Sequence, residues 1–378
     1  MDENWVATWG NGPQKTETRN LPPQKLNNNS LRQNLRVSIG GEKIRVQFSN
    51  MFGNSPVTIQ GAEIAKSAGG SNIVPETNVP IMFNGQPGVT MEKGTAAWSD
   101  PLDFSFEALE VLAVTIYFGE VSKAVTGHPG SRTTSYIMQG KNLDVEKFAA
   151  NLRTNHWYIL TRIDVDAPDD AATIVVIGDS ITDGRGSTTN KNNRWPDNLA
   201  ARLQESEDLK NIAVVNMGIG GNAVFSGGLG PKALDRFDRD VLDVAGVKWL
   251  LILHGVNDIG GASGKTAIRR VSQNMINAYK EMIDKAHDAG ILVYGIPILP
   301  FAENGGYDTP DRLKIREIIN QWIYTSGEFD AVLPLEQAVL DPYHPDKLRD
   351  DLDDNDYLHL NAKGYQTMAD AIDLDLFR

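Results

Sequence analysis

The stretch VVIGDSITDG, residues 175–184, decides the fold predicted for the second half of the chain. A continuous apolar run ends at Gly178, and the hydroxyl side chain of Ser180 follows between Asp179 and Asp183. A run that is apolar at every position is typical of a strand buried on both faces of a parallel sheet. Ser180 therefore follows the carboxyl end of a predicted strand, where it is either a nucleophile or the N-cap of the next helix.

Four more short apolar runs follow this stretch and alternate with amphipathic segments. The runs cover 212–217, 247–255, 291–299 and 331–336, and helices are predicted at 194–207, 230–243, 265–289, 309–325 and 361–372. Alternating strands and helices are typical of a parallel sheet with helices on both faces. The pattern predicts a flavodoxin-like, doubly wound α/β domain with about five strands over residues 168–378.

The first part of the chain, residues 1–167, differs, because its apolar pattern from about residue 31 to 165 has a period of two. The segment LRVSIGGEKIRVQF, residues 35–48, predicts a β-hairpin that turns at Gly40 and Gly41. Further strands are predicted at 57–65, 79–83, 111–118 and 156–165, between turn residues. This spacing favours a separate β-sandwich domain of the jelly-roll kind.

Composition excludes several classes of partner and chemistry. The 49 acidic against 36 basic side chains give a net charge of −13, which disfavours nucleic acid and anionic membrane surfaces as partners. The absence of cysteine excludes thiol nucleophiles, thiolate metal sites and disulfides. No run approaches the roughly 20 apolar residues of a membrane span, and the first ten residues lack a signal-peptide pattern. We expect a soluble chain, either cytoplasmic or secreted with its signal removed, and leave the compartment and the oligomeric state open.

Chemically active side chains follow the predicted strands, where ligands bind in open parallel sheets. They lie in Gly178–Ser180, Gly218–Asn222, His254–Asp258 and Pro300–Glu303, and Asp356 and His359 lie near the C-terminus. A hydroxyl, an imidazole, a carboxylate and an amide are the groups that nucleophilic acyl transfer requires.

Four segments resemble, in order, the signature blocks of the GDSL family, also called SGNH hydrolases. They are GDSITD at 178–183, VVNMGIGGN at 214–222, HGVND at 254–258 and DYLHLNAKGY at 356–365. The resemblance implies a serine esterase with the triad Ser180, Asp356 and His359. It also implies an oxyanion hole formed by the backbone N–H groups of Ser180 and Gly221 and the side chain of Asn257. In the third block, His254-Gly255-Val256 replaces the more usual Gly-Gly before Asn257.

Other patterns compete with this assignment. Asp341 and His344 repeat the D-x-x-H spacing, but the prolines around them suit a surface loop. The run from Gly218 to Ala223 is similar to a dinucleotide-binding fingerprint, yet it follows the second strand rather than the first, and we expect neither a cofactor nor a metal. Further candidates for substrate binding are Asp179, His254, Phe301 and Tyr307. Phe301 and Tyr307 either line the pocket or only pack a loop, and Asp179 is also suited to orienting the Ser180 turn.

Together these features predict a metal-independent serine esterase acting on short-chain acyl esters, with a small-molecule or oligosaccharide acyl ester as substrate. Deacetylation of carbohydrate is the most specific expectation, because some carbohydrate esterases of the family carry an N-terminal β-sandwich. A lipase or lysophospholipase of the same fold, or a non-catalytic glycan-binding protein, is the alternative. The sequence leaves open whether the predicted β-sandwich binds glycan, shapes the pocket or is only structural.

Overall fold

The computed structural model describes residues 3–150 and 152–378, and the chain divides into two compact units. The N-terminal unit comprises Met1–Ala171 together with Thr189–Asn192, and the C-terminal unit comprises Ala172–Thr188 and Asn193–Arg378. Among the described residues, no helix combines the length and the hydrophobicity that crossing a membrane requires.

The C-terminal unit is built on a parallel sheet of five strands in the order β18-β17-β19-β20-β21. The strands are β17 (Ala172–Gly178), β18 (Ile212–Gly218), β19 (Val247–Leu253), β20 (Leu292–Gly295) and β21 (Ala331–Val332). Every residue of β17 and β18 is buried, which is why both appear in the sequence as continuous apolar runs. The predicted parallel sheet of about five strands is confirmed.

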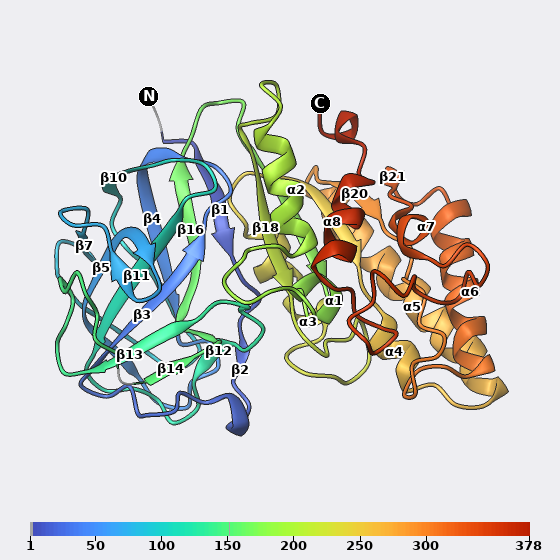
Figure 1. Ribbon diagram of the computed structural model, residues 1–378, viewed down its shortest axis with the longest axis horizontal. Coiled ribbons are helices and arrows are strands. Elements are labelled where there is room, and N and C mark those ends of the chain that lie inside the picture. Colours follow the sequence, from blue (N-terminus) through green and yellow to red (C-terminus); the bar gives the residue numbers. More distant parts are fainter. Residues whose placement is uncertain (1–2, 151) are drawn as a thin grey trace. The chain divides into compact units, whose positions relative to one another are not determined.

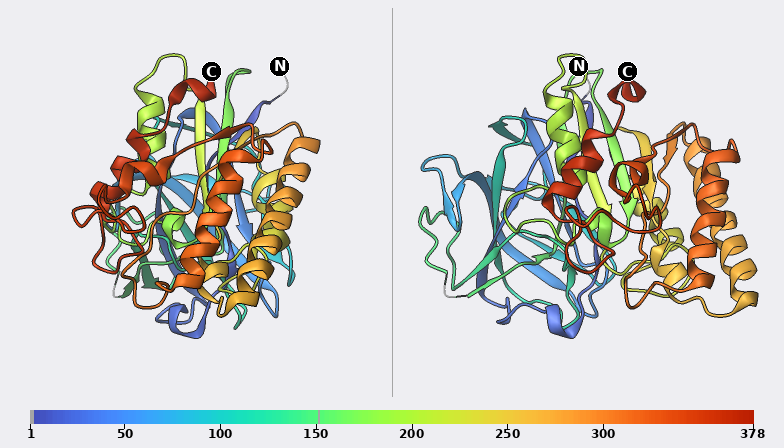
Figure 2. Two further views of the ribbon diagram at one scale, coloured as in Figure 1. Left: turned by 90° about the vertical axis from the view of Figure 1, so that its right-hand side faces the viewer. Right: turned by 45° about the vertical axis from the view of Figure 1, so that its right-hand side comes forward.

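Helices cover both faces of this sheet. Figure 2 shows α5 (Lys265–Asp288) and α6 (Pro310–Thr325) on one side and α2 (Trp195–Gln204) and α8 (Ala362–Asp370) on the other. This follows from right-handed crossovers, because the strand order runs one way from β17 to β18 and the other way from β17 to β21. The remaining helical elements are short: α1 (Ser180–Asp183), α3 (Ala233–Phe237), the π-helix η2 (Asp238–Leu242), α4 (Val256–Gly260), α7 (Leu335–Val339) and the 3₁₀ turn η3 (Leu374–Phe377).

Two strands of this sheet are shorter than the apolar runs that predict them. β20 ends at Gly295 and β21 at Val332, whereas the runs extend to 299 and 336. Pro297 and Pro334 lie just beyond these ends, and proline has no N–H to donate to a strand ladder.

The N-terminal unit consists mostly of antiparallel strands, as the period-two pattern predicts (Figure 1). One sheet contains β1 (Trp5–Gly10), β16 (Leu160–Asp166), β4 (Gly41–Ser49), β10 (Leu102–Phe106) and β9 (Ala96–Trp98). A second contains β14 (Leu152–Thr154), β13 (Ser135–Gln139), β3 (Asn29–Arg36), β11 (Val111–Phe118), β5 (Val57–Gly69), β6 (Asn72–Ile73), β7 (Val79–Ile81) and β8 (Val89–Met91). Shorter elements are the three-stranded sheet of β15 (Trp157–Tyr158), β12 (Thr126–His128) and β2 (Gln14–Lys15), and the 3₁₀ turn η1 (Thr18–Asn20). The jelly-roll topology expected of this half stays a prediction.

The hairpin predicted for residues 35–48 is wrong. β3 and β4 belong to different sheets, and the chain passes from one sheet to the other between them. The Val37 N–H donates to the Glu110 carbonyl, next to β11, whereas the Ser38 N–H donates to the Thr8 carbonyl of β1. A period of two reports burial on one face and does not identify the partner strand, so a crossover and a hairpin produce the same pattern.

Candidate active site

The first three strands of the parallel sheet end in register. Gly178, the last residue of β17, pairs with Gly218 of β18 on one side and with Leu253 of β19 on the other. The segments that follow therefore begin at the same edge of the sheet. They carry Ser180, Gly221 and Asn257, respectively.

Ser180 is the first residue of the one-turn helix α1, and Asp179 is the N-cap. The Asp179 carboxylate accepts a hydrogen bond from the Ile181 N–H at 3.1 Å, so the capping function does not occupy the Ser180 hydroxyl. The close turn depends on Gly178, where a Cβ would lie 2.4 Å from Thr182 Oγ1 and 2.5 Å from the Leu253 carbonyl oxygen. The N-cap of α1 is therefore Asp179 and not Ser180.

Three predicted triad residues, distant in sequence, form one hydrogen-bonded chain. Ser180 Oγ lies 2.7 Å from His359 Nε2, and His359 Nδ1 lies 2.6 Å from Asp356 Oδ2. Ser180 is 9% exposed and His359 is 3% exposed. With the ring proton on Nδ1 facing the carboxylate, Nε2 is free to accept the hydroxyl proton of Ser180.

The loop that carries Asp356 holds its carboxylate in the charged form. Asp356 Oδ1 accepts from the backbone N–H groups of Leu358 and His359, at 3.0 and 2.8 Å. Desolvation acts to raise the pKa of Asp356, but the hydrogen bonds from the His359 ring and from these backbone groups outweigh it and lower the pKa to about 2. Asp356 is therefore ionised at any pH at which an ester would ordinarily be assayed.

Three hydrogen-bond donors lie in the segments that follow β17, β18 and β19. Among the described residues, no acceptor is found for the backbone N–H groups of Ser180 and Gly221, whereas the Gly220 N–H donates to Asp183 Oδ2 at 3.1 Å. Gly221 has a φ of 71°, a conformation that glycine adopts readily. Asn257 uses one proton of Nδ2 for the Asn222 carbonyl at 2.7 Å, which leaves its second proton available.

Tyr307 fixes the orientation of the Asn257 amide. Its hydroxyl donates to Asn257 Oδ1 at 2.7 Å, so the Nδ2 end must face the other way. The Tyr307 ring packs against Gly260 at the end of the same helix, α4, where a Cβ would lie 2.5 Å from the ring. Tyr307 is partly exposed and is the one additional substrate-binding candidate that the structure leaves open to a ligand.

The structure places the other three of these candidates behind the site. Asp179, His254 and Phe301 are 2%, 1% and 0% exposed. The Phe301 ring contacts the Tyr307 ring edge-on, with 6.2 Å between the centroids. His254 Nε2 lies 3.1 Å from Asn222 Oδ1, and His254 Nδ1 is 3.8 Å from Asp179 Oδ2, too far for a hydrogen bond. Burial and the nearby Arg236 guanidinium place the pKa of His254 well below its ordinary value, so this neighbouring pair is not an ion pair.

A buried polar network, which sequence reasoning did not assign, supports the Gly221 and Asn257 segments. Arg236 donates to Asn222 Oδ1 and to the carbonyls of Met217 and Gly178, and pairs with Asp240 at 2.9 Å. Asp258 accepts from the backbone N–H groups of Val224, Phe225 and Ser226. Asn222 and Asp258 lie inside the quoted motifs GIGGN and HGVND, but nothing in the sequence indicates the contribution of Arg236.

The competing histidine, His344, lies in an exposed loop. The Asp341 carboxylate accepts from the backbone N–H groups of Tyr343 and His344, at 2.8 and 3.0 Å, and so stabilises a turn. Among the described residues, the imidazole that contacts Ser180 is that of His359.

The buried carboxyl group of Asp179 should make the free energy of unfolding depend on pH. Burial, followed by the neighbouring carboxylates Asp258 and Asp183, raises its pKa from 3.8 to about 7 against the effect of its backbone hydrogen bonds. Because the folded state binds this proton more tightly than the unfolded state, the free energy of unfolding falls as the pH rises from about 4 to about 7. Asp179→Asn removes this titration and keeps an oxygen for the Ile181 N–H. We expect the variant to gain on the order of 2 kcal/mol relative to wild type between pH 5 and pH 8.

Urea denaturation at several pH values measures this difference. Titrating groups distant from Asp179 contribute about equally to both proteins and cancel in the comparison. Stability profiles of wild type and variant that run parallel across this range would contradict the assigned protonation.

Comparisons with known proteins find similar solved structures. Three solved structures each align with 53% of the chain. The first is a lipase/acylhydrolase from Enterococcus faecalis, with 21% sequence identity, 92% of that chain covered and a TM-score of 0.40. The second is a GDSL-like lipase from Bacteroides thetaiotaomicron, with 19% identity, 84% of that chain covered and a TM-score of 0.38. The third is an acetyl xylan esterase variant from Geobacillus stearothermophilus, with 19% identity, 92% of that chain covered and a TM-score of 0.39. A search of curated protein sequences finds no match.

The protein is a carboxylic ester hydrolase. More narrowly, the chain belongs to the GDSL-like lipase/acylhydrolase family, whose sequence model matches residues 176–367. The matched range contains all four signature blocks identified in the sequence.

Proposed function

We propose that the protein is a serine esterase that removes short acyl groups, acetyl above all, from carbohydrate. The observation that carries this proposal is the hydrogen-bonded chain from Ser180 Oγ through His359 to Asp356, with contacts of 2.7 and 2.6 Å. A serine hydroxyl becomes an effective nucleophile near neutral pH only when a base is within reach of its proton, and His359 occupies that position.

In the proposed mechanism, His359 Nε2 takes the hydroxyl proton while Ser180 Oγ attacks the carbonyl carbon. Asp356 holds the ring through Nδ1 and stabilises the imidazolium. The oxyanion accepts hydrogen bonds from the N–H groups of Ser180 and Gly221 and from Asn257 Nδ2. His359 then protonates the departing alcohol oxygen, and the acyl group remains on Ser180. Water adds to this acyl-enzyme with His359 again as base, which releases the acid and restores the hydroxyl.

Polar groups around Ser180 support a hydroxyl-rich alcohol. Tyr307 and Asn304 lie on one loop, and the Asn304 side chain donates to the Asp356 carbonyl at 2.6 Å. The Arg185 side chain is 58% exposed, with Nη2 3.8 Å from Asp356 Oδ2. These side chains offer donors and acceptors to sugar hydroxyl groups at the rim of the proposed site.

The apolar surface near the site supports a short acyl group. Large apolar side chains with substantial exposure are scattered over the described residues: Met51, Val74, Leu229, Leu292, Tyr324 and Tyr343. Of these, Leu229 packs beside Gly221, where its Cδ1 would lie 3.0 Å from a Cβ. One aliphatic side chain suits an acetyl group better than a long chain, which needs a continuous apolar surface.

A series of esters tests this function. We expect kcat/KM to be highest for 4-nitrophenyl acetate and to fall roughly tenfold or more for the decanoate, because the added methylenes find little apolar surface. The same preparation should release acetate from acetylated xylo-oligosaccharides. A preference for decanoate would favour a lipase or lysophospholipase, and binding of oligosaccharide without hydrolysis of any ester would favour a glycan-binding protein.

The contact between Tyr307 and Asn257 gives a further prediction. Tyr307→Phe removes the hydroxyl that orients the amide, and we expect kcat for 4-nitrophenyl acetate to fall roughly tenfold with little change in KM. Asn257→Ala, which removes the donor itself, should lower kcat roughly 10²- to 10³-fold. Steady-state kinetics measure both, with Tyr343→Phe, 87% exposed, as the matched control. A raised KM with unchanged kcat in Tyr307→Phe would instead assign Tyr307 to ground-state binding.

A further inference from the structure

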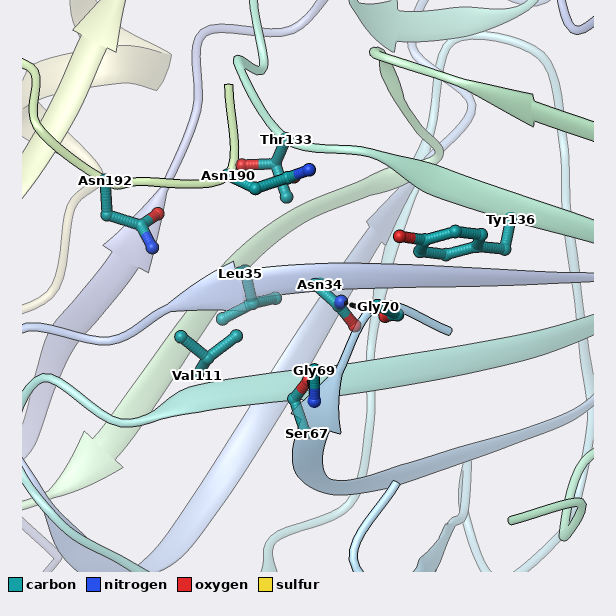
Figure 3. A pocket seen from close by; sticks show the side chains of 10 residues that line it. All are labelled: Asn34, Leu35, Ser67, Gly69, Gly70, Val111, Thr133, Tyr136, Asn190 and Asn192. Atoms are coloured by element: carbon teal, nitrogen blue, oxygen red, sulfur yellow. Dashed lines mark hydrogen bonds between the residues drawn. The ribbon is translucent and has the colours of Figure 1, made fainter. Parts of the chain in front are cut away.

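A pocket of about 320 Å³ lies within the N-terminal unit (Figure 3). It is lined by Asn34, Leu35, Ser67, Gly69, Gly70, Val111, Thr133, Tyr136, Asn190 and Asn192. All of these residues belong to the N-terminal unit, because the short segment Thr189–Asn192 is part of it. The pocket volume is at the lower end of the roughly 300–1,000 Å³ that small-molecule sites occupy.

The lining of the pocket is polar but carries no charge. Three side chains end in an amide and three in a hydroxyl, and one of these, Tyr136, adds an aromatic ring. The strand register places Asn34 and Tyr136 on one face of the second sheet, because Tyr136 pairs with Arg32, two residues before Asn34. Figure 3 shows both side chains at the pocket, on neighbouring strands. None of the lining side chains is a cation that could pair with a phosphate or carboxylate, and the nearby Arg36 guanidinium donates to the Asn192 carbonyl.

Several hydrogen-bonding groups of this lining have no partner in the described part of the chain. Asn34 is only 7% exposed. Its Nδ2 donates to the Gly70 carbonyl at 2.6 Å, but no donor reaches its Oδ1. No hydrogen bond is found for the Tyr136 hydroxyl or for the Asn192 side-chain amide among the described residues. Buried polar atoms are normally paired, so Asn34 Oδ1 indicates a ligand that can donate to it.

The wall formed by the segment 189–192 is held firmly in place. Asn190 accepts from the Thr134 N–H at 2.7 Å and donates to Thr134 Oγ1 at 2.9 Å. Arg36 Nη1 donates to the Asn192 carbonyl at 3.0 Å. The backbone at Asn190 and Asn192 is left-handed, with φ of 64° and 48°. These contacts leave the Asn192 side chain free while its backbone is fixed, which reduces the entropy that a ligand must overcome.

We propose that this pocket is a second ligand site, which binds one ring of a neutral oligosaccharide. Sugar hydroxyl groups both donate and accept, and so match the acceptor of Asn34, the amide of Asn192 and the hydroxyl of Tyr136. The C–H face of the sugar packs on the Tyr136 ring. The site is independent of Ser180, so the proposal does not depend on the proposed esterase function.

Isothermal titration of the full-length protein with xylotetraose, cellotetraose and mannotetraose tests the proposal, with tetragalacturonate as the charged probe. We expect at least one neutral tetrasaccharide to bind with Kd in the range of about 10 μM to 1 mM. Tyr136→Ala should weaken binding roughly tenfold or more, and Tyr136→Phe, which keeps the ring, by less. Asn192→Gly removes the amide while glycine keeps the left-handed backbone, and it should also weaken binding severalfold.

Tyr117→Ala, on β11 of the same sheet and outside the pocket, is the matched control and should bind as wild type does. Hydrolysis of 4-nitrophenyl acetate should be unchanged in all pocket variants, which separates this site from Ser180, and thermal unfolding like that of wild type shows that the variants are folded. The proposal is overturned if no neutral tetrasaccharide binds, if tetragalacturonate binds more tightly than all of them, or if Tyr136→Phe and Asn192→Gly bind as wild type does.

Discussion

Ser180→Ala is expected to lower kcat for 4-nitrophenyl acetate roughly 10⁴-fold or more, with little effect on the free energy of unfolding. The reason is local. The side chain supplies the nucleophile, whereas the turn that holds it is capped by Asp179. Alanine is a good helix former, so it fits the first position of α1 without loss of the turn. Steady-state kinetics and thermal unfolding of the same preparation measure the two effects.

Ser187→Ala is the matched control for this variant. Ser187 lies on the segment that follows α1, and the substitution removes the same hydroxyl group without touching His359. Its kcat should remain within about twofold of wild type, as expected for a residue outside the reacting groups. A Ser180→Ala enzyme that keeps even a tenth of the wild-type kcat would contradict the assignment of the nucleophile.

His359→Ala should reduce kcat by a similar factor of roughly 10⁴, because Ser180 loses the base that accepts its proton. The chain offers an unusually close control, since His344 has the same D-x-x-H spacing to Asp341. His344→Ala, in its exposed loop, should leave kcat unchanged within about twofold. The ratio of the kcat values of the two variants shows whether activity requires the imidazole at position 359 specifically.

The same comparison can be made for the two aspartates, Asp356 and Asp341, that precede these histidines. Asp356→Asn leaves the shape of the loop and removes the charge that stabilises the imidazolium, so kcat should fall by about 10³ to 10⁴. Asp341→Asn should change kcat by less than about twofold, because that carboxylate only accepts backbone hydrogen bonds of its own turn. Equal losses in the two Asp variants, or in the two His variants, would contradict the proposed triad.

Much of the C-terminal unit could be predicted because its signals are local. The strands β17 and β18 are buried at every residue, so each leaves an uninterrupted apolar run that no neighbouring element obscures. Parallel strands of one sheet end at a common edge, and this geometric rule predicts that the segments carrying Ser180, Gly221 and Asn257 begin there. The structure also places His359 beside Ser180, although their catalytic roles stay predictions until they are assayed.

The remainder depends on contacts between residues distant in sequence. The hairpin predicted at 35–48 is wrong because an alternating pattern shows that one face of a strand is buried but does not identify the partner strand. β3 in fact pairs with β11 and β13. Likewise, the hydrogen bond from Tyr307 to Asn257 joins positions 50 residues apart, and no local pattern distinguishes that hydroxyl from one exposed to water. The assignment of Thr189–Asn192 to the N-terminal unit is another long-range feature without a signal in composition or period.

Covalent labelling with a serine-reactive aryl phosphonate, followed by peptide mass spectrometry, directly tests the assignment of Ser180 as the acylated nucleophile. We expect one adduct per chain, on the peptide containing Ser180, that forms in step with the loss of esterase activity and is absent from Ser180→Ala. An active enzyme that is inhibited without an adduct at Ser180, or that carries the adduct on another residue, would contradict it.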